Sequence, residues 1–314
     1  MPVIHNKPVN GIIPWKTDFK RNWSLYLIFV PVLVYFVLFN YLPMFGIVMA
    51  FQDFKISRGF LGSAFVGLRN FIELFTGETF GLVMRNTIVM SLLNLTIGYV
   101  APIIFAIIIT EAKLPRFKRA AAVVSYIPNF IAAVVVAQLT REFLSRSGSI
   151  TGMLAWFGFD KQNWLANSDV PVFWIINTII NIWIGLGYGS RIFVAAISNV
   201  NADLYEASAI DGAGRLRRLF FITLPCITPM IVMMFTLRIG LVFVVGFDKI
   251  LLLYMPTTYA TADVLTTYTY RMAFGMQTNY SLSSASGLFQ SVIGTILLLI
   301  SNWLSKKATS SSLI

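Results

Sequence analysis

Residues 199–225 read NVNADLYEASAIDGAGRLRRLFFITLP, and they separate two long apolar stretches, 172–197 and 227–245. The stretch is polar at its start, holds two glycines and three arginines in its middle, and ends at a proline. Among the connections on the same side of the predicted membrane, it is the only long one. The chain therefore carries a structured polar loop between two segments that are long enough to cross a bilayer.

The loop has the composition of a short helix followed by a tight reversal. Asp203, with Glu206 three residues later, has the form of an N-cap and capping box. Residues 204–210 would then form a short amphipathic helix, and Gly212 and Gly214 permit the reversal that ends it. The sequence predicts a helix that lies on the membrane and presents one face to the cytoplasm.

The composition of the whole chain indicates a multi-pass membrane protein. Of its 314 residues, 57% are hydrophobic, 15% are aromatic and only 12% are charged. A soluble domain carries about 25% charged residues, so this chain cannot cover a soluble surface of its size. The formal net charge of +11 suggests a charge bias across a bilayer rather than nucleic-acid binding.

Six apolar stretches have the length of a membrane-spanning helix, which predicts an all-α membrane protein with six transmembrane helices. They are Leu25–Val48, Thr87–Ile109, Ala120–Leu139, Val172–Ile197, Ile227–Val245 and Leu288–Leu304. Short loops on the side of the N-terminus hold most of the Lys and Arg residues, so both termini are expected in the cytoplasm. The predicted organisation is a cytoplasmic segment 1–24, a transmembrane domain 25–305 that includes the loop 199–225, and a cytoplasmic tail 306–314.

The sequence lacks the motifs of an enzyme. One cysteine and one histidine leave no His/Cys metal cluster. No phosphate-binding Gly-x-x-x-x-Gly-Lys-Ser/Thr, no Gly-x-Ser-x-Gly and no His-Glu-x-x-His occurs. We therefore expect a non-catalytic chain without cofactor or metal, whose energy comes from another polypeptide.

The spacing within the loop is specific. It consists of Glu206-Ala207-Ser208, three residues, Gly212, nine residues, and Ile222-Thr223-Leu224-Pro225. This pattern resembles the EAA loop of binding-protein-dependent ABC importer permeases, except that Ser208 stands where Ala is usual. The resemblance implies that the loop, here called the coupling loop, binds a groove on a cytoplasmic ATPase. The implied contact residues are Asp203, Glu206, Ala207, Ser208, Asp211, Gly212, Ala213 and Gly214.

Other segments extend the resemblance to the carbohydrate, maltose-type, family of these permeases. Asn181–Tyr188 and Tyr268–Phe274 resemble the maltose importer's larger membrane subunit. Phe39–Pro43, Ala50–Asp53 and Gly246–Ile250 look more like the branch that imports oligosaccharides or polysaccharide fragments.

The family resemblance implies a fold and a set of partners. The fold is that of a type I ABC importer permease in a bacterial plasma or inner membrane, in contact with membrane lipid and not with nucleic acid. The partners are a second homologous permease, an extracellular solute-binding protein, and two copies of an ABC ATPase that binds ATP and Mg.

One face of the fourth predicted span carries the candidate solute-binding residues. Asn177, Asn181, Gly185 and Tyr188 recur at helical spacing, and Asn amides suit sugar hydroxyls. By resemblance, Asn181, Ile184, Gly185 and Tyr188 match the motif that contacts sugar. The alternative is close helix packing through Gly185 and Gly189.

Arg238 lies far along the fifth span, nearer the outer surface, where it either attracts an acidic sugar or pairs with Asp248. Weaker candidates are expected mainly to form interhelical hydrogen bonds; they are Asn94, Tyr99, Tyr126, Asn129 and Gln138.

Two alternatives remain for the function of the chain. One is an ABC permease for another solute, such as a polyol or glycerol phosphate. The other is a secondary transporter that works without ATP.

Overall fold

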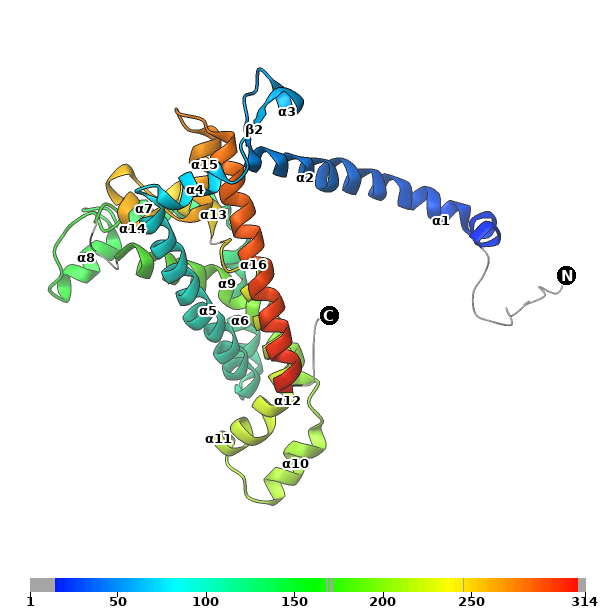
Figure 1. Cartoon of the computed structure of the whole chain (residues 1–314). Helices are drawn as coiled ribbons and strands as arrows, with labels where there is room; N and C mark the ends of the chain where they lie inside the picture. The colour runs from blue at the N-terminus through cyan, green and yellow to red at the C-terminus, as the bar shows by residue number, and fades with distance from the viewer. Residues whose placement is uncertain (1–14, 168, 170–171, 245, 310–314) are drawn as a thin grey trace.

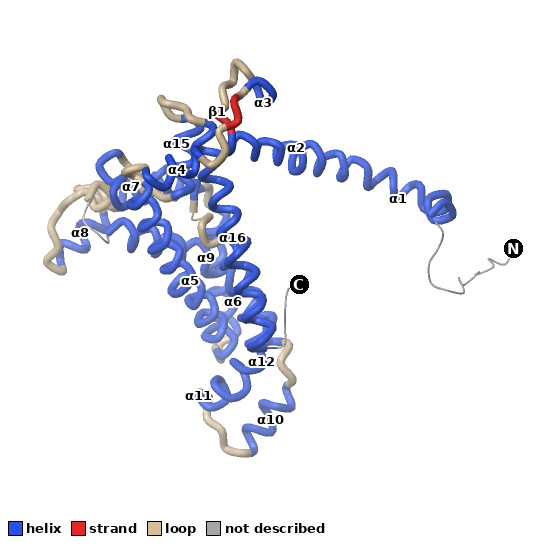
Figure 2. The backbone as a smooth tube through the Cα atoms, viewed as in Figure 1, coloured by secondary structure: helices blue, strands red, loops and turns tan. Residues whose placement is uncertain are grey.

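A computed structural model describes residues 15–167, 169, 172–244 and 246–309. Helices dominate these residues (Figure 2). The sheet within this part of the chain is a single antiparallel pairing of β1 (Gln52–Asp53) with β2 (Ala64–Phe65). The prediction of an all-α membrane protein is confirmed apart from this short pairing.

Among the described residues, five helical stretches are long and apolar enough to cross a membrane, and a bent pair of helices makes up to six. The five are α1 (Trp15–Phe36) with η1 (Val37–Tyr41), α2 (Leu42–Met44) and η2 (Phe45–Phe51); α5 (Phe80–Glu111); α9 (Val172–Ser198); α11 (Arg215–Arg218) with η4 (Leu219–Thr223) and α12 (Leu224–Gly240); and α16 (Tyr280–Thr309).

Shorter elements gather at the two ends of the bundle (Figure 1). One end carries α3 (Gly59–Gly62), α4 (Arg69–Thr76), α8 (Ser149–Trp156), α13 (Phe247–Leu253), η5 (Pro256–Thr258), α14 (Tyr259–Ala262) and α15 (Leu265–Phe274). From the opposite end, α10 (Ala202–Ile210) projects beyond the bundle, next to α11 at the start of the stretch Arg215–Gly240. The coupling loop is thus a separate protrusion at one end.

The third predicted span, Ala120–Leu139, is broken near its middle. It is a bent pair, in which α6 (Pro115–Tyr126) and α7 (Ala133–Phe143) meet at 100° across the short 3₁₀ helix η3 (Ile127–Phe130). Pro128 lies in η3, and proline both lacks a backbone N–H and disfavours helical geometry in the residue before it. The apolar composition predicts the length of this span but not the bend between its two helices.

The core forms where α5 and α9 run side by side. Towards the end with α13 and α14, it contains the buried side chains of Met90, Phe173 and Ile250. Towards the coupling loop, Tyr99 and Phe193 join Ile227 of α12. The two long helices are therefore fixed against each other along most of their length.

Backbone contact fixes α6 against α9. A Cβ atom added to Gly187 of α9 would lie 2.4 Å from the carbonyl carbon and oxygen of Ser125 in α6. Real Cβ atoms do not approach other atoms so closely, so only glycine allows this contact. Gly187 therefore sets the distance between the two helices.

The elements α13–α15 form a cap that is tied to the long helices by hydrogen bonds. Asn86 of α5 donates to the carbonyl oxygens of Ala260 (3.1 Å) and Asp263 (2.9 Å). Trp174 of α9 donates to the carbonyl of Thr261 at 2.8 Å. Inside the cap, Arg271 pairs with the buried Asp263 at 2.5 Å. The cap thus moves with α5 and α9 rather than as a free loop.

The first long helix lies apart from the bundle. The arm, defined here as residues 15–44 with α1, η1 and α2, extends away from the other helices, and the chain rejoins the bundle through η2 and α16 (Figure 1). No side chain in the apolar window of this helix is buried, and Ile28 remains 71% exposed. An apolar helix of this length needs a bilayer or a partner helix against it.

Candidate functional site

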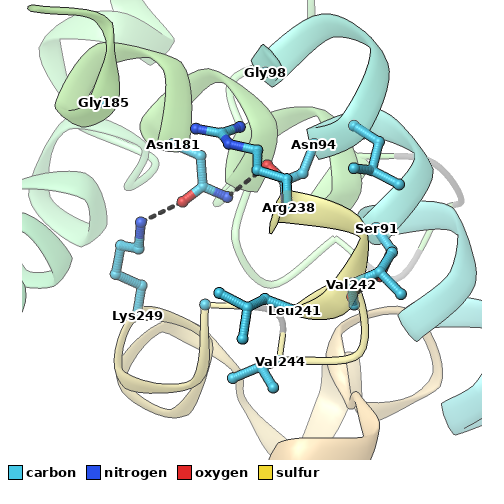
Figure 3. A pocket seen from close by; sticks show the side chains of 12 residues that line it. Ser91, Asn94, Gly98, Asn181, Gly185, Arg238, Leu241, Val242, Val244 and Lys249 are labelled. Atoms are coloured by element: carbon cyan, nitrogen blue, oxygen red, sulfur yellow. Dashed lines mark hydrogen bonds between the residues drawn. The ribbon is translucent and has the colours of Figure 1, made fainter. Parts of the chain in front are cut away.

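A polar cavity of about 320 Å³ lies between α5, α9, the end of α12 and the segment that leads into α13 (Figure 3). Each element contributes one side to it. The lining residues are Ser91, Asn94, Leu95 and Gly98 of α5; Asn181 and Gly185 of α9; and Arg238, Leu241, Val242, Val244, Gly246 and Lys249 from the chain after Leu237.

A chain of hydrogen bonds crosses the cavity wall. The Lys249 ammonium donates to Oδ1 of Asn181, and Nδ2 of Asn181 donates to Oδ1 of Asn94 at 3.3 Å. Ser91 donates to the carbonyl of Val242 at 2.5 Å. These bonds join α5, α9 and α13 around one space, so a solute that binds here contacts three parts of the fold.

Two cations line this cavity and neither has an acidic partner. Within the described ranges, the ion pairs are Lys55–Asp53 and Arg271–Asp263, both outside the cavity. Arg238 instead has its guanidinium 5.6 Å from the ring centroid of Tyr99. Burial lowers the pKa of the Lys249 ammonium. The negative charge of Asp248 acts in the other direction and raises this pKa, but burial is the larger effect.

Of the two alternatives for Arg238, the ion pair with Asp248 is not formed, because Arg238 faces the cavity in the last turn of α12. Its guanidinium and the Lys249 ammonium both face the cavity (Figure 3). They are available to an anion from outside the chain.

The predicted solute face of α9 is only partly exposed to the cavity. Asn181 and Gly185 line it, and Tyr188 lines an adjoining cavity of about 220 Å³ that also reaches Arg238. Ile184 packs instead against the apolar core. A Cβ at Gly185 would meet nothing within 4 Å, so Gly185 leaves open space rather than a close helix contact.

Asn177, predicted on the solute pathway, lies outside the cavity in this structure. Its side chain is 1% exposed and does not line the cavity. Its Nδ2 lies 3.7 Å from the Met90 sulfur, in the apolar contact between α5 and α9. One turn before Asn181, α5 packs so closely on α9 that the helix face remains inside the core.

Among the weaker candidates, Asn94 and Tyr99 form the predicted interhelical hydrogen bonds. Asn94 accepts from Asn181, and Tyr99 donates to the carbonyl of Ile231. Asn94 in addition lines the cavity. Tyr126 stacks on Tyr188 with a centroid distance of 6.2 Å.

Lys249 is a cavity residue that sequence reasoning did not select. It lies in α13, in what the hydropathy pattern marks as an outer loop, and only the fold turns it back onto α9. Its position in the segment Gly246–Ile250, which had carried part of the family resemblance, is the signal that could have drawn attention to it.

The coupling loop has the predicted helix but a different cap. The helix α10 starts at Ala202, and its N-cap is Asn201, whose Oδ1 accepts the Asp203 N–H at 3.1 Å. The predicted N-cap and capping box of Asp203 and Glu206 are therefore wrong. Asn201, two residues earlier, caps the helix with its side chain, which leaves Asp203 as a first-turn acid.

The reversal predicted after α10 at Gly212 and Gly214 depends on the left-handed conformation of Gly212 alone. Gly212 has a φ of 71°, and the Ala213 N–H donates back to the Ser208 carbonyl at 2.9 Å. This is how a left-handed residue closes a helix C-terminus. Gly214 has a φ of −67° and starts α11 in an ordinary conformation.

The coupling loop exposes the residues that the resemblance implies. Glu206, Ala207, Asp211 and Gly212 are exposed, and the neighbouring Ile210 is 88% exposed. The other implied residues lie in the same turn of chain; Asp203 and Gly214 are exposed, and Ser208 and Ala213 half-buried. A hydrogen bond between the hydroxyls of Tyr205 and Thr223 (2.9 Å) holds α10 against η4.

The fold, the cavity and the protruding loop define a multi-pass permease of the inner membrane. The chain belongs to the family of binding-protein-dependent transport system inner membrane components, whose model matches residues 103–310. The predicted family and fold are thereby confirmed.

Two curated relatives show how far the similarity extends. The chain is 40% identical to the polygalacturonan/rhamnogalacturonan transport system permease protein YteP of Bacillus subtilis, over 90% of this chain and 88% of the relative. It is 30% identical to the sn-glycerol-3-phosphate transport system permease protein UgpA of Yersinia pestis, over 91% of this chain and 94% of UgpA.

A solved structure matches nearly the whole chain. It is a bacterial alginate ABC transporter in complex with a periplasmic protein that holds an alginate pentasaccharide. One of its chains superposes with a TM-score of 0.87 at 36% identity, over 96% of this chain and 100% of that chain.

Proposed function

We propose that this chain is the permease subunit of an ABC importer for an acidic oligosaccharide, delivered by an extracellular solute-binding protein. The observation that carries the proposal is the pair of cations, Arg238 and Lys249, which line one cavity without an acidic partner among the described residues. The amides of Asn94 and Asn181 line the same cavity and suit sugar hydroxyls.

Charge explains why an acid fits this cavity better than a neutral sugar. A cation taken out of water loses hydration, and an anion near it restores the lost stabilisation. A carboxylate about 4 Å from one of these cations gains roughly 4 kcal/mol at an effective dielectric constant of 20. Tyr99 and Tyr188, in the adjoining cavity, offer aromatic faces for sugar rings.

The named solutes of the relatives support an anion. Polygalacturonan and alginate are carboxylated polysaccharides, and sn-glycerol-3-phosphate is also an anion. The solute in the name of UgpA, sn-glycerol-3-phosphate, favours a second candidate for the transported solute, a small phosphorylated polyol. Both candidates need the same two cations, and they differ in the length of the solute.

Energy coupling is proposed to run through α10. ATP and Mg bind to two copies of a separate cytoplasmic ATPase, whose groove receives the exposed face of α10. Closure of the ATPase pair on ATP pulls this helix and opens the pathway outward, and hydrolysis resets it. The exposed Ile210 and the projection of the loop beyond the bundle support this contact.

The second permease is proposed to cover the arm and to complete the pathway. The apolar side chains of the arm have no counterpart in the described bundle, and a homologous subunit offers the matching helices. The partner is further proposed to supply the wall of the pathway that faces this chain's cavity.

The test is uptake by the assembled transporter in liposomes. Galacturonate trisaccharide is compared with its carboxyl-reduced, neutral counterpart in wild type, Arg238→Gln and Lys249→Gln. Each variant removes one charge-assisted contact, so uptake of the acid is expected to fall about tenfold or more while uptake of the neutral sugar stays unchanged.

Lys55→Gln is the matched control, because Lys55 is an exposed cation outside the cavity. Equal loss for acid and neutral sugar in the cavity variants refutes the role of charge. Uptake of glycerol phosphate but of no oligosaccharide selects the second candidate. Uptake without ATP refutes the importer mechanism.

A further inference from the structure

A second cationic cavity, of about 520 Å³, lies towards the end of the bundle that carries the coupling loop. It is formed by the last turn of α5, the first half of α6 and the second half of α9. Three cations line it, and the remaining lining is small or apolar. The lining residues are Ile109, Pro115, Lys118, Arg119, Ala122, Gly187, Ser190, Arg191, Val194 and Ala195.

This cavity is distinct from the proposed solute cavity, because α9 lies between them. At about 100° per residue, Gly187 and Val194 lie on the side of α9 opposite to Asn181 and Gly185, which line the solute cavity. The backbone contact of Gly187 with Ser125 closes the gap between α6 and α9 at this level. The two cavities are therefore separate spaces.

The three cations have no internal counter-charge. No ion pair involving Lys118, Arg119 or Arg191 is found in the described part of the chain, and no acid lines the cavity there. The Arg191 guanidinium lies over the ring of Tyr126, 3.9 Å from its centroid. Stacking leaves the N–H groups at the edge of the guanidinium plane free for an anion.

The shape of the lining matches an amphipathic anion. Lys118 and Arg119 lie in the first turns of α6, where the chain enters the membrane, while Ala122, Val194 and Ala195 give the cavity an apolar wall. Phosphate groups suit clustered Lys and Arg, and acyl chains suit the wall. A sugar acid would leave the apolar wall without a partner.

We propose that this cavity binds the headgroup of an anionic phospholipid, with Lys118, Arg119 and Arg191 on its phosphate and the first acyl carbons along α9. Such a lipid would hold α6 against α9 at the end that carries the coupling loop. The bilayer is then a specific ligand of the permease and not only its solvent.

The test is lipid binding to the assembled transporter in detergent, followed by native mass spectrometry. Phosphatidylglycerol is titrated against phosphatidylcholine. Wild type is expected to bind phosphatidylglycerol saturably. Each removed cation is expected to weaken this binding about fivefold, so Arg191→Gln gives about fivefold and the double variant Lys118→Gln/Arg119→Gln about 25-fold.

Two controls separate a specific site from general charge. Lys113→Gln/Arg116→Gln removes two cations from the same short loop that do not line the cavity, so it should bind lipid as wild type does. Arg191→Lys keeps the charge and should restore most of the binding lost in Arg191→Gln.

Four results overturn the proposal. The first is equal binding of phosphatidylcholine, and the second is equal loss in the Lys113→Gln/Arg116→Gln control. The third is competition by galacturonate trisaccharide, which would make the cavity part of the solute pathway. Absence of any saturable lipid in the assembled transporter would show that the second permease covers the cavity, and it equally refutes the lipid site.

Discussion

Replacement of Gly212 by valine tests whether the shape of the coupling loop depends on a single backbone conformation. Gly212 follows α10 with a φ of 71°, and its N–H donates to the Ala209 carbonyl at 3.1 Å. A Cβ at this position would meet no atom within 4 Å. The cost of a side chain here is therefore backbone strain alone, without any steric clash.

The size of the effect follows from the left-handed conformation. It costs an ordinary L-residue roughly 1 to 2 kcal/mol, and a β-branched residue lies at the upper end. A change of 1 to 2 kcal/mol alters a two-state population by a factor of about 5 to 30. Gly212→Val should therefore lower ATP-driven uptake about 5- to 30-fold, while Gly212→Asn, which tolerates this conformation, should retain most of it.

The assay is the initial rate of uptake in liposomes, normalised to the amount of inserted transporter. Gly212→Asn is the matched control, since it adds a side chain at the same exposed position but tolerates the left-handed conformation. Near-normal uptake in Gly212→Val, or equal loss in Gly212→Asn, would refute the backbone argument.

Further predictions concern stability. Gly187→Ala should lower the detergent unfolding temperature, because its Cβ would meet the α6 backbone at 2.4 Å, whereas Gly185→Ala, with open space, should leave it unchanged. Asn201→Ala removes the α10 cap, costs about 1 kcal/mol, and should raise amide exchange in α10 about fivefold. Asp203→Ala should change that exchange less, because only a first-turn charge is lost. Asp263→Ala should destabilise the fold by about 3 kcal/mol in chemical denaturation, since it leaves a partly buried arginine unpaired; wild-type stability would contradict this.

The sequence was sufficient for properties that depend on composition and local pattern. Apolar length marked the membrane-crossing segments, and the spacing from Glu206 to Pro225 identified the family. The helix in the coupling loop and the reversal at Gly212 follow from local rules as well. These features depend on a few consecutive residues, so one chain suffices to see them.

Features that depend on distant contacts were missed. Lys249 reaches Asn181 only because α13 folds back onto α9, and no local pattern encodes that return. Asn177 shares a helix face with Asn181, but the packing of α5 removes it from the cavity. The N-cap was misplaced by two residues because Asn201 and Asp203 are both good caps, and only the path of the chain after α9 decides between them.

The isolated position of the arm has a consequence for biogenesis. The apolar window of the first long helix buries no side chain against the bundle. The remaining helices can therefore reach their packed state while the arm still lies in lipid alone. Maturation then has two stages, bundle first and arm last, as expected when helices insert independently before they associate. Under the proposed assembly with a second permease, a chain made in excess of that partner would keep an unpaired apolar helix in the bilayer, and this helix would mark it as an orphan subunit for membrane quality control.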